Sequence, residues 1–367
     1  MVVGIDSSRA FRAHKTGVEW YSYHVIRGLA QIDHKNRYQL YSDVVLPEAE
    51  KTWLPENFNY RRLRWPIKSL WTQGRLSWEM RRRPSDVLFV PAHVIPSVHP
   101  QKTVNTVHDV GFLDYPEGYS EKQLQYLKWS TRLAIKTCKK IITVSHFTKQ
   151  ALIERFDADA DRIFVTHLGY DRERYVPGHG NTEITERYGI VGPYIFYSGR
   201  LEPRKNIETL LKIFELLRTQ GIEISLVIAG PLGFKGDTYL EMIKRHPYSQ
   251  AIRYVGWVSE EDKIGLLQNA FAMIFPSFYE GFGLPLIEAQ ACGVPVVCSD
   301  TTSLPEVGGD GALFFNPRQP EEAAGYIATL SRDLGRRQRL IKKGIENAQR
   351  FDWVTTAQQT QEILTQW

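Results

Sequence analysis

Short apolar runs alternate along the chain with longer segments in which apolar residues recur at helical spacing. Residues 18–31 form one such segment, because Val18, Tyr21, Val25 and Leu29 would share one face of a helix. The short runs are bounded by glycine, proline and polar residues, which is typical of buried strands in a parallel sheet. They occupy residues 2–5, 38–41, 87–90, 103–107, 141–144, 163–166, 194–197, 224–229, 252–255, 271–275 and 294–298. The alternation predicts an α/β fold.

The strand–helix alternation begins twice, once at the N-terminus and again near residue 194. Residues 176–192 separate the two series and contain one proline and four glycines, which favours a hinge between domains. The chain has 367 residues, whereas a single hydrophobic core seldom grows beyond about 250–300 residues. We therefore expect a first domain at 1–178 and a second domain that begins at 179.

The most informative stretch runs from Ser277 to Ala289, between two apolar runs. It places Glu280 and Glu288 on either side of a turn with two glycines, and Pro285 suits the start of a helix. The pattern predicts a strand, a glycine loop and a helix N-terminus, which is a ready site for an anion. Carboxylates repel an anion, so the two acids would serve neutral hydroxyl groups beside it, as in a nucleoside diphosphate sugar. The residues alone leave open a plain strand-to-helix turn with two solvated acids.

Charged residues also follow the ends of two other predicted strands. Arg200 and Lys205 flank the start of a helix, where a diphosphate would meet both positive side chains and backbone N–H groups. In the first half, His108 and Asp109 come directly after a predicted strand. The carboxyl ends of parallel strands face the ligand crevice in such folds, so both loops are expected at a binding edge. A solvated basic loop and a structural histidine are the alternatives.

Charge is divided unevenly between the two halves. Residues 1–180 hold 27 Lys and Arg against 19 Asp and Glu, a net of +8, and the remaining residues hold 19 against 22, a net of −3. Within the basic half, residues 60–84 carry eight Lys and Arg against Glu79, with three tryptophans between them. Such a segment favours peripheral contact with an anionic membrane, or contact with a phosphorylated acceptor. The alternative is a solvated helix face with buried tryptophans.

Cysteine usage and hydropathy bear on the compartment and on cofactors. Cys138, Cys292 and Cys298 show no metal-binding spacing and suit a reducing compartment. The sequence has no signal-peptide pattern and no apolar run of about 20 residues. We therefore expect a cytoplasmic protein that lies, at most, on the inner face of the membrane. The Asp-x-Asp sequence at 157–159 is expected to be a surface turn, and no Gly-x-Gly-x-x-Gly sequence suggests a nicotinamide cofactor.

The sequence Glu-Gly-Phe-Gly-Leu-Pro-Leu-Ile-Glu at 280–288 resembles the donor-site signature of retaining GT-B glycosyltransferases of the family 4 type. The resemblance covers nearly the whole chain and is densest over 194–306. It implies an α/β fold of two facing Rossmann-like domains with parallel sheets and an active site in the interdomain cleft. The donor domain would then comprise residues 179–350, and a C-terminal helix at 351–367 would cross back to the N-terminal domain.

The resemblance also implies roles for individual residues. The catalytic residues would be Glu280, Arg200, Lys205 and His108. The donor-binding residues would be Gly17, Gly230, Val258, Gly281, Phe282, Gly283, Leu284 and Glu288. The acceptor side would hold Asp109, His14, Lys15 and Ser145, with Asp109 as the candidate base. We expect no metal ligands and no cofactor beyond the donor substrate.

The implied activity is the transfer of a hexose from a nucleoside diphosphate sugar with retained configuration. Arg200, Lys205 and the helix N-terminus would stabilise the leaving diphosphate without a metal. The sequence shows no obvious carboxylate nucleophile of the kind that retaining glycosidases use, which favours attack from the face of the leaving group. The stretch around His108 looks most like mannosyl- and rhamnosyltransferases. GDP-mannose is therefore the first choice of donor, and a glycan, a lipid-linked molecule or a small molecule is the expected acceptor.

Two other functions stay open. A nucleotide-sugar epimerase or a phosphorylase uses the same fold, although the sequence lacks clear additional acid–base carboxylates and a pyridoxal lysine signature. A non-catalytic protein that binds anionic lipid or nucleic acid through the basic half is the other alternative. The donor-site residues of the second half argue against it, and no specific nucleic-acid contact is expected.

Overall fold

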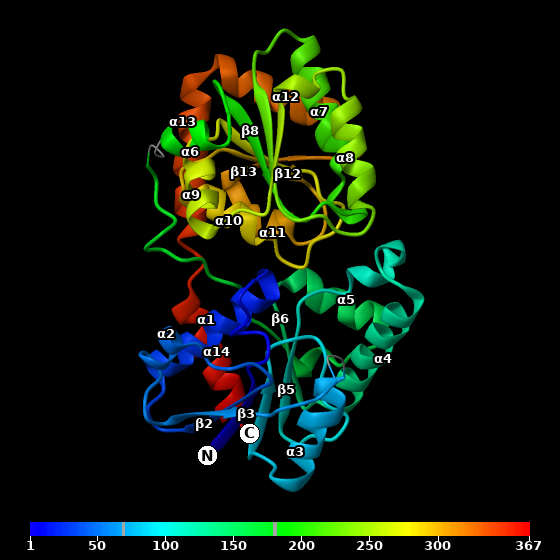
Figure 1. Ribbon diagram of the computed structural model, residues 1–367, viewed down its shortest axis with the longest axis vertical. Coiled ribbons are helices and arrows are strands. Elements are labelled where there is room, and N and C mark those ends of the chain that lie inside the picture. Colours follow the sequence, from blue (N-terminus) through cyan, green and yellow to red (C-terminus); the bar gives the residue numbers. More distant parts are fainter. Residues whose placement is uncertain (68–69, 179–181) are drawn as a thin grey trace. The chain divides into compact units, whose positions relative to one another are not determined.

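The computed structural model describes residues 1–67, 70–178 and 182–367. The chain forms two compact units (Figure 1). Unit 1 consists of Met1–Phe112, Ser120–Gly169 and Asp352–Trp367, and unit 2 consists of Leu113–Tyr119 and Tyr170–Phe351. Lys68 of the predicted basic segment and residues 179–181 of the predicted hinge lie outside the described residues.

Unit 1 is built on a seven-stranded parallel sheet with the strand order β3-β2-β1-β4-β5-β6-β7. Its strands are β1 (Val2–Asp6), β2 (Arg37–Ser42), β3 (Phe58–Arg62), β4 (Val87–Val90), β5 (Thr103–Val107), β6 (Lys140–Thr143) and β7 (Ile163–Val165). Its helices are α1 (Gly17–Ile32), α2 (Glu48–Lys51), the π-helix η1 (Thr72–Leu76), α3 (Ser77–Arg82), α4 (Glu121–Thr137), α5 (His146–Phe156), the 3₁₀ turn η4 (Ala160–Arg162) and α14 (Trp353–Thr365), and the 3₁₀ turn η2 (Gly111–Leu113) ends where unit 2 begins. The strand order reverses between β1 and β4, as in doubly wound folds.

Unit 2 contains a six-stranded parallel sheet with the order β10-β9-β8-β11-β12-β13. Its strands are β8 (Tyr194–Ser198), β9 (Ser225–Ala229), β10 (Ile252–Gly256), β11 (Ala272–Phe275), β12 (Val296–Ser299) and β13 (Ala312–Phe315). Its helices are α6 (Thr182–Arg187), α7 (Ile207–Thr219), α8 (Gly236–Arg245), α9 (Glu260–Gln268), α10 (Leu284–Ala291), α11 (Leu304–Gly308), α12 (Pro320–Arg332) and α13 (Leu334–Ala348). Short 3₁₀ turns are η3 (Pro116–Gly118), η5 (Pro203–Lys205), η6 (Ser249–Ala251) and η7 (Gly309–Gly311). This order is the Rossmann order, with its reversal between β8 and β11.

The apolar runs become central strands because helices cover both faces of each sheet. Every residue of β4 and of β11 is buried, as expected for parallel strands with two covered faces. Two strands, β3 and β13, lie outside the predicted runs. Strand β3 has the sequence Phe-Asn-Tyr-Arg-Arg at the edge of its sheet, where one apolar face suffices, and it occupies the start of the predicted basic segment.

The last helix belongs to the same compact unit as the N-terminal sheet. Helix α14 packs on α1 at Gly28, where an added Cβ would lie 2.6 Å from the Ala357 Cβ. The hydroxyl of Thr356 also donates to the carbonyl of His167, 2.6 Å away. The unit division falls after Gly169, nine residues before the expected boundary at 178. The segment 113–119, expected in the first domain, belongs to unit 2.

The prediction of an α/β fold with two parallel-sheet, Rossmann-like domains is confirmed by these two sheets. Among the described residues, no helix combines the length and the apolar character that crossing a membrane requires.

Candidate active site

The strand order of unit 2 brings two loops together at one edge of its sheet. Strands β8 and β11 are neighbours at the point where the order reverses, so the loops after them, residues 199–206 and 276–283, meet at the carboxyl edge. This is the place where open α/β sheets bind their ligands. The predicted motif with Arg200 and Lys205 falls on the first loop, and the motif at 280–288 begins on the second loop and continues into α10.

The loop after β8 is fixed by Asn206, which adopts a left-handed conformation with φ 56°. Its side-chain oxygen caps α7 by accepting from the Thr209 N–H, 3.4 Å away. Its side-chain nitrogen donates to the carbonyls of Pro276 and Pro317, each at 3.1 Å. Asn206 is buried, so these bonds tie the β8 loop to the start of the β11 loop without competition from water.

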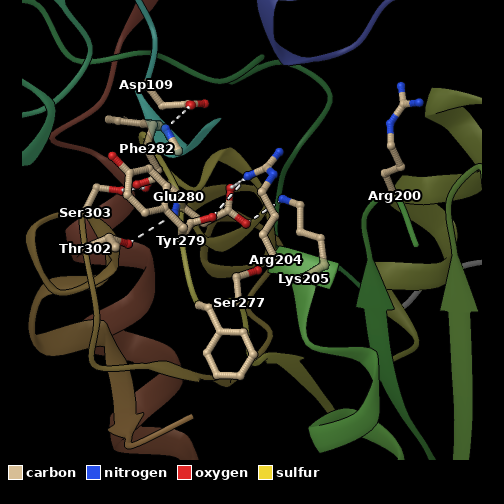
Figure 2. A network of polar contacts seen from close by, with 12 residues as sticks. Asp109, Arg200, Arg204, Lys205, Ser277, Tyr279, Glu280, Phe282, Thr302 and Ser303 are labelled. Atoms are coloured by element: carbon tan, nitrogen blue, oxygen red, sulfur yellow. Dashed lines mark hydrogen bonds and ion pairs between the residues drawn. The ribbon is translucent and has the colours of Figure 1, made fainter. Parts of the chain in front are cut away.

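The loop after β11 is held on both sides. The Phe278 N–H donates to the Arg204 carbonyl at 2.8 Å, and the Arg204 guanidinium donates back to the Tyr279 carbonyl at 3.0 Å. On the other side, the Ser303 hydroxyl donates to the carbonyls of Glu280 and Phe282, at 2.9 and 2.8 Å (Figure 2). The position of Glu280 is therefore set by backbone contacts that do not depend on its carboxylate.

The Glu280 carboxylate lies between two cations (Figure 2). One oxygen is 2.5 Å from Lys205 Nζ, and the other is 3.4 Å from a guanidinium nitrogen of Arg204. The Arg204 side chain also pairs with Glu202 at 2.6 Å. Glu280 and Lys205 are both buried. Burial acts to raise the pKa of Glu280, but the charges of Lys205 and Arg204 outweigh it and hold that pKa below its ordinary value. The carboxylate is thus ionised and already paired.

Helix α10 begins directly after this loop. Gly283 precedes it with φ 106°, a conformation that favours glycine, and an added Cβ would lie 2.8 Å from a Leu304 methyl group. The helix starts at Leu284, so Pro285 is its second residue and not its first as expected. Leu284 is among the first residues of α10, whose N–H groups have no partner within a helix. Because α10 follows β11, its N-terminus lies at the carboxyl edge of the sheet, where the loop after β8 carries Lys205.

The buried Glu288 is the fifth residue of α10 and belongs to a second network of ionisable side chains. Lys263 of α9 bridges Glu288 at 3.1 Å and Glu260 at 3.0 Å. The Tyr175 hydroxyl donates to Glu260 at 2.7 Å, and Lys263 Nζ lies 5.3 Å from the Tyr175 ring centre. Burial raises the pKa of Glu288, and the nearby charge of Glu260 raises it further against the opposing effect of Lys263.

Three predicted residues of unit 2 stand apart from these networks. Arg200 is exposed, and its side chain lies away from Lys205 and Glu280 (Figure 2). Gly230 has a packing reason to be glycine, because it has φ 138° and an added Cβ would come within 2.0 Å of the Gly199 carbonyl oxygen. Val258 is half-buried in the turn between β10 and α9.

In unit 1, His108 follows β5 and is oriented by its surroundings. Its Nε2 lies 2.9 Å from the Pro91 carbonyl oxygen, which can only accept, so Nε2 carries the proton. Burial lowers the pKa of His108, which keeps the ring neutral near pH 7. Its Nδ1 is therefore a hydrogen-bond acceptor. The adjacent Asp109 accepts from the Gly111 N–H at 2.9 Å.

The other predicted residues of unit 1 lie on two loops. Gly17 is the exposed first residue of α1, and an added Cβ would meet nothing within 4 Å. His14 is exposed, whereas the Lys15 ammonium lies 5.2 Å from the Trp20 ring centre. Ser145 is buried and caps α5, because its hydroxyl accepts from the Thr148 N–H at 3.1 Å.

Three residues of these networks were not predicted from the sequence. Arg204 stands beside Lys205 in a basic loop of the sequence, and only the fold shows that both side chains meet Glu280. Lys263 follows Glu260, Glu261 and Asp262 on α9 and looks like part of a solvated charged helix. Ser303 occurs in a segment that resembled the family, but nothing in the sequence indicates that its hydroxyl holds the β11 loop.

Two family models match the chain, one in each half. Residues 15–174 match the model described as "Glycosyltransferase Family 4", and residues 183–347 match "Glycosyl transferases group 1". Among curated proteins, the chain is 31% identical over 362 residues to the O-antigen chain mannosyltransferase B of Escherichia coli. This match covers 94% of each chain.

Solved structures share the fold over the whole chain. Sucrose-phosphate synthase from Thermosynechococcus elongatus superimposes with a TM-score of 0.77 at 18% identity, over 99% of this chain and 98% of that one. Anabaena Alr3699/HepE in complex with UDP-glucose gives a TM-score of 0.74 at 19% identity, over 100% and 99% of the two chains. The two family models and the mannosyltransferase relative confirm the resemblance seen in the sequence, and the chain belongs to the group 1 glycosyltransferases of the family 4 type, with the GT-B fold.

Proposed function

We propose that this glycosyltransferase moves a hexose from a nucleoside diphosphate sugar to its acceptor, with retained anomeric configuration and without a metal ion. The observation that carries the proposal is the buried Lys205–Glu280 pair beside the α10 N-terminus, at the ligand-binding edge of the unit 2 sheet. The cation and the backbone N–H groups there suit a diphosphate, and the carboxylate suits sugar hydroxyls.

Departure of the nucleoside diphosphate places growing negative charge on the outer phosphate. Lys205, Arg204 and the α10 N-terminus would stabilise that charge, and fixed groups of this kind need no reorganisation during the reaction. Arg200 would join them only after its exposed side chain turned toward the loop. Because these cations supply the positive charge, the proposal needs no metal.

Glu280 and Glu288 would accept hydrogen bonds from hydroxyl groups of the donor. Glu280 has its charge balanced by Lys205 and Arg204, so it is a weak base and a poor candidate for a covalent nucleophile. This favours attack on the same face as the leaving group over the two-step route of retaining glycosidases. We assign Glu288, with Lys263 beside it, to the ribose hydroxyls.

The unit 1 residues would serve the transferred sugar and the acceptor. His108 presents a neutral nitrogen acceptor, which suits a sugar hydroxyl as donor. Asp109 is the candidate base for the acceptor, and His14 and Lys15 lie on the loop before α1. Ser145 is the weakest member of this set, because its hydroxyl already caps a helix.

The donor we propose first is GDP-mannose. Support comes from the relative described as an O-antigen chain mannosyltransferase, which covers 94% of this chain. The solved structure of Alr3699/HepE contains UDP-glucose, so UDP-glucose and UDP-N-acetylglucosamine are the competing donors. A growing glycan is the acceptor class that fits the description of the same relative, and a lipid-linked or small-molecule acceptor is the alternative.

A thermal-shift panel tests this proposal. A ligand that binds only the native state raises the melting temperature by mass action, so GDP-mannose should raise it more than the two UDP sugars. The shift should persist in EDTA and should be smaller in Lys205→Ala. No shift with any nucleotide sugar would contradict the proposed function, and a shift only with a UDP sugar would replace the proposed donor.

A further inference from the structure

Helices α3 and α4 of unit 1 belong to one continuous surface layer (Figure 1). The Gln73 side chain, just before α3, donates to the Ile95 carbonyl at 2.8 Å and contacts the Tyr126 hydroxyl of α4 at 3.3 Å. The loop after β4 lies in the same layer, because the Ser77 hydroxyl accepts from the Val98 N–H at 3.4 Å. The layer therefore joins the predicted basic segment to a helix that the sequence did not connect with it.

This layer exposes large apolar side chains. Trp78 of α3 is 48% exposed, Trp129 of α4 is 43% exposed, and Val98 of the loop after β4 is 40% exposed. Trp129 stacks on Tyr126, with ring centres 5.7 Å apart, so it is linked to the contact between the two helices. Exposed tryptophans at one surface are unusual for a soluble face and typical of an interface.

The same layer is strongly basic. Its exposed cations include Arg81, Arg82, Lys122, Arg132 and Lys136. Glu79, the acid of α3, is buried and paired with Arg61 and Arg75, each at 2.9 Å. Its negative charge therefore does not offset the charges of the exposed cations. Glu121, on the first turn of α4, is an exposed acid of this layer.

A basic hollow continues the layer at the far end of α4. It has a volume of about 500 Å³, and its charged lining residues are Arg132, Lys136, Arg155, Arg162, Glu154 and Asp157. Four cations face two acids in this lining, and one of the cations, Arg162, is also paired with Asp159 at 3.3 Å, so the hollow is mildly basic. It suits a phosphate-bearing headgroup.

We propose that the α3–α4 surface, defined by Trp78, Val98 and Trp129 with Arg81, Arg82, Lys122, Arg132 and Lys136, docks on an anionic phospholipid membrane. Tryptophan rings and basic side chains together favour the headgroup region, where the ring meets the apolar boundary and the cations meet lipid phosphates. This inference does not depend on the donor or the acceptor of the proposed function.

Nucleic acid fits this surface less well. The guanidinium carbons of Arg75 and Arg82 lie 4.7 and 4.9 Å from the Trp78 ring centre, so a base that stacked on those parts of the ring would have to displace them. Val98 also offers an apolar group with no counterpart on a phosphate backbone. At a membrane surface, Trp78 and Val98 would meet the apolar boundary while the arginines beside Trp78 meet lipid phosphates.

Co-sedimentation with vesicles tests the inference. The full chain is mixed at low salt with vesicles of phosphatidylcholine and phosphatidylglycerol, and separately with pure phosphatidylcholine. We expect binding to the mixed vesicles alone, weakened by salt. Arg81→Gln/Arg82→Gln should bind about 25-fold more weakly, at about fivefold per cation lost. Trp78→Ala/Trp129→Ala should bind about tenfold more weakly or worse.

The controls remove the same residue types elsewhere on the chain. Arg336→Gln/Arg339→Gln takes two exposed arginines from α13 of unit 2, and Trp257→Ala removes a tryptophan that is 58% exposed. Both should bind vesicles like the wild type, and circular dichroism should show every variant folded. Absence of binding to the mixed vesicles would overturn the inference. Equal losses of vesicle binding in the control variants would also overturn it. The same holds if the variants of the α3–α4 surface lose binding to a DNA oligonucleotide but keep vesicle binding.

Discussion

Glu280 is a buried carboxylate whose charge is balanced by two side chains from the neighbouring loop. The sequence showed that this acid and Lys205 belong to candidate donor-site motifs, but their contact joins positions 75 apart in the chain. Residue type and spacing within one motif cannot reveal such a pair, because it depends on which strands are neighbours. The same reason accounts for the unpredicted contact of Lys263 with Glu288, which is 25 positions away.

The lowered pKa of Glu280 predicts how unfolding depends on pH. The unfolded chain binds a proton here near pH 4.5, but the folded chain does so only at lower pH. Between those two values the unfolded state holds more protons, so the stabilisation is full above pH 4.5 and is lost as the pH falls through the folded pKa. Glu280→Gln should therefore show a flatter loss of unfolding free energy on acidification than the wild type.

Urea titrations at a series of pH values, followed by circular dichroism, measure this slope. Glu241→Gln is the matched control, because Glu241 also has a lowered pKa from Lys244 but lies on an exposed face of α8. Its removal should leave the slope close to that of the wild type, since exposed pairs are screened by solvent. Equal slopes for Glu280→Gln and the wild type would refute the ion pair.

At the scale of elements, the apolar runs located every strand except two edge strands, β3 and β13. Both β3 and β13 are edge strands of their sheets, and β3 alternates apolar and polar side chains within a basic segment. The order of the strands was available only from the family resemblance, because hydrophobic periodicity carries no information about which strands pair. That order is what places the β8 and β11 loops side by side.

Two glycines at element ends illustrate different reasons for one residue type. Gly230, after β9, has a left-handed backbone and a neighbouring carbonyl that excludes a side chain. Gly230→Ala should destabilise the protein by about 3 kcal/mol or more. Gly17, at the start of α1, has open space around it, so Gly17→Ala should change stability by less than about 1 kcal/mol.

The same pair separates folding from donor binding. If the donor approaches the backbone at Gly17, a methyl group there should weaken binding about tenfold, because forcing an extra methyl into a close contact costs roughly 1–3 kcal/mol. Thermal unfolding and donor titration of both variants measure the two effects. A Gly17→Ala protein with normal stability and normal donor affinity would remove Gly17 from the donor site.

At the scale of the whole molecule, the chain contains two parallel-sheet units with different surface chemistry. Unit 1 carries the basic, tryptophan-bearing α3–α4 surface, and unit 2 carries the buried networks around Glu280 and Glu288. The charge imbalance between the halves was visible in the sequence. The sequence did not show that positive charges gather on a layer formed by α3, α4 and the loop after β4, because that layer joins segments separated by the central strands.

The transfer rate of Lys205→Ala relative to the wild type tests the central claim most directly. The readout is release of the nucleoside diphosphate and transfer of label from the nucleotide sugar that gives the largest thermal shift. Lys212→Ala, which removes an exposed lysine of α7, is the matched control. With the folded state confirmed by circular dichroism, kcat/KM of Lys205→Ala should fall about 100-fold or more, and Glu288→Ala should fall as far. A folded Lys205→Ala protein that transfers sugar at nearly the wild-type rate would contradict the proposed donor site.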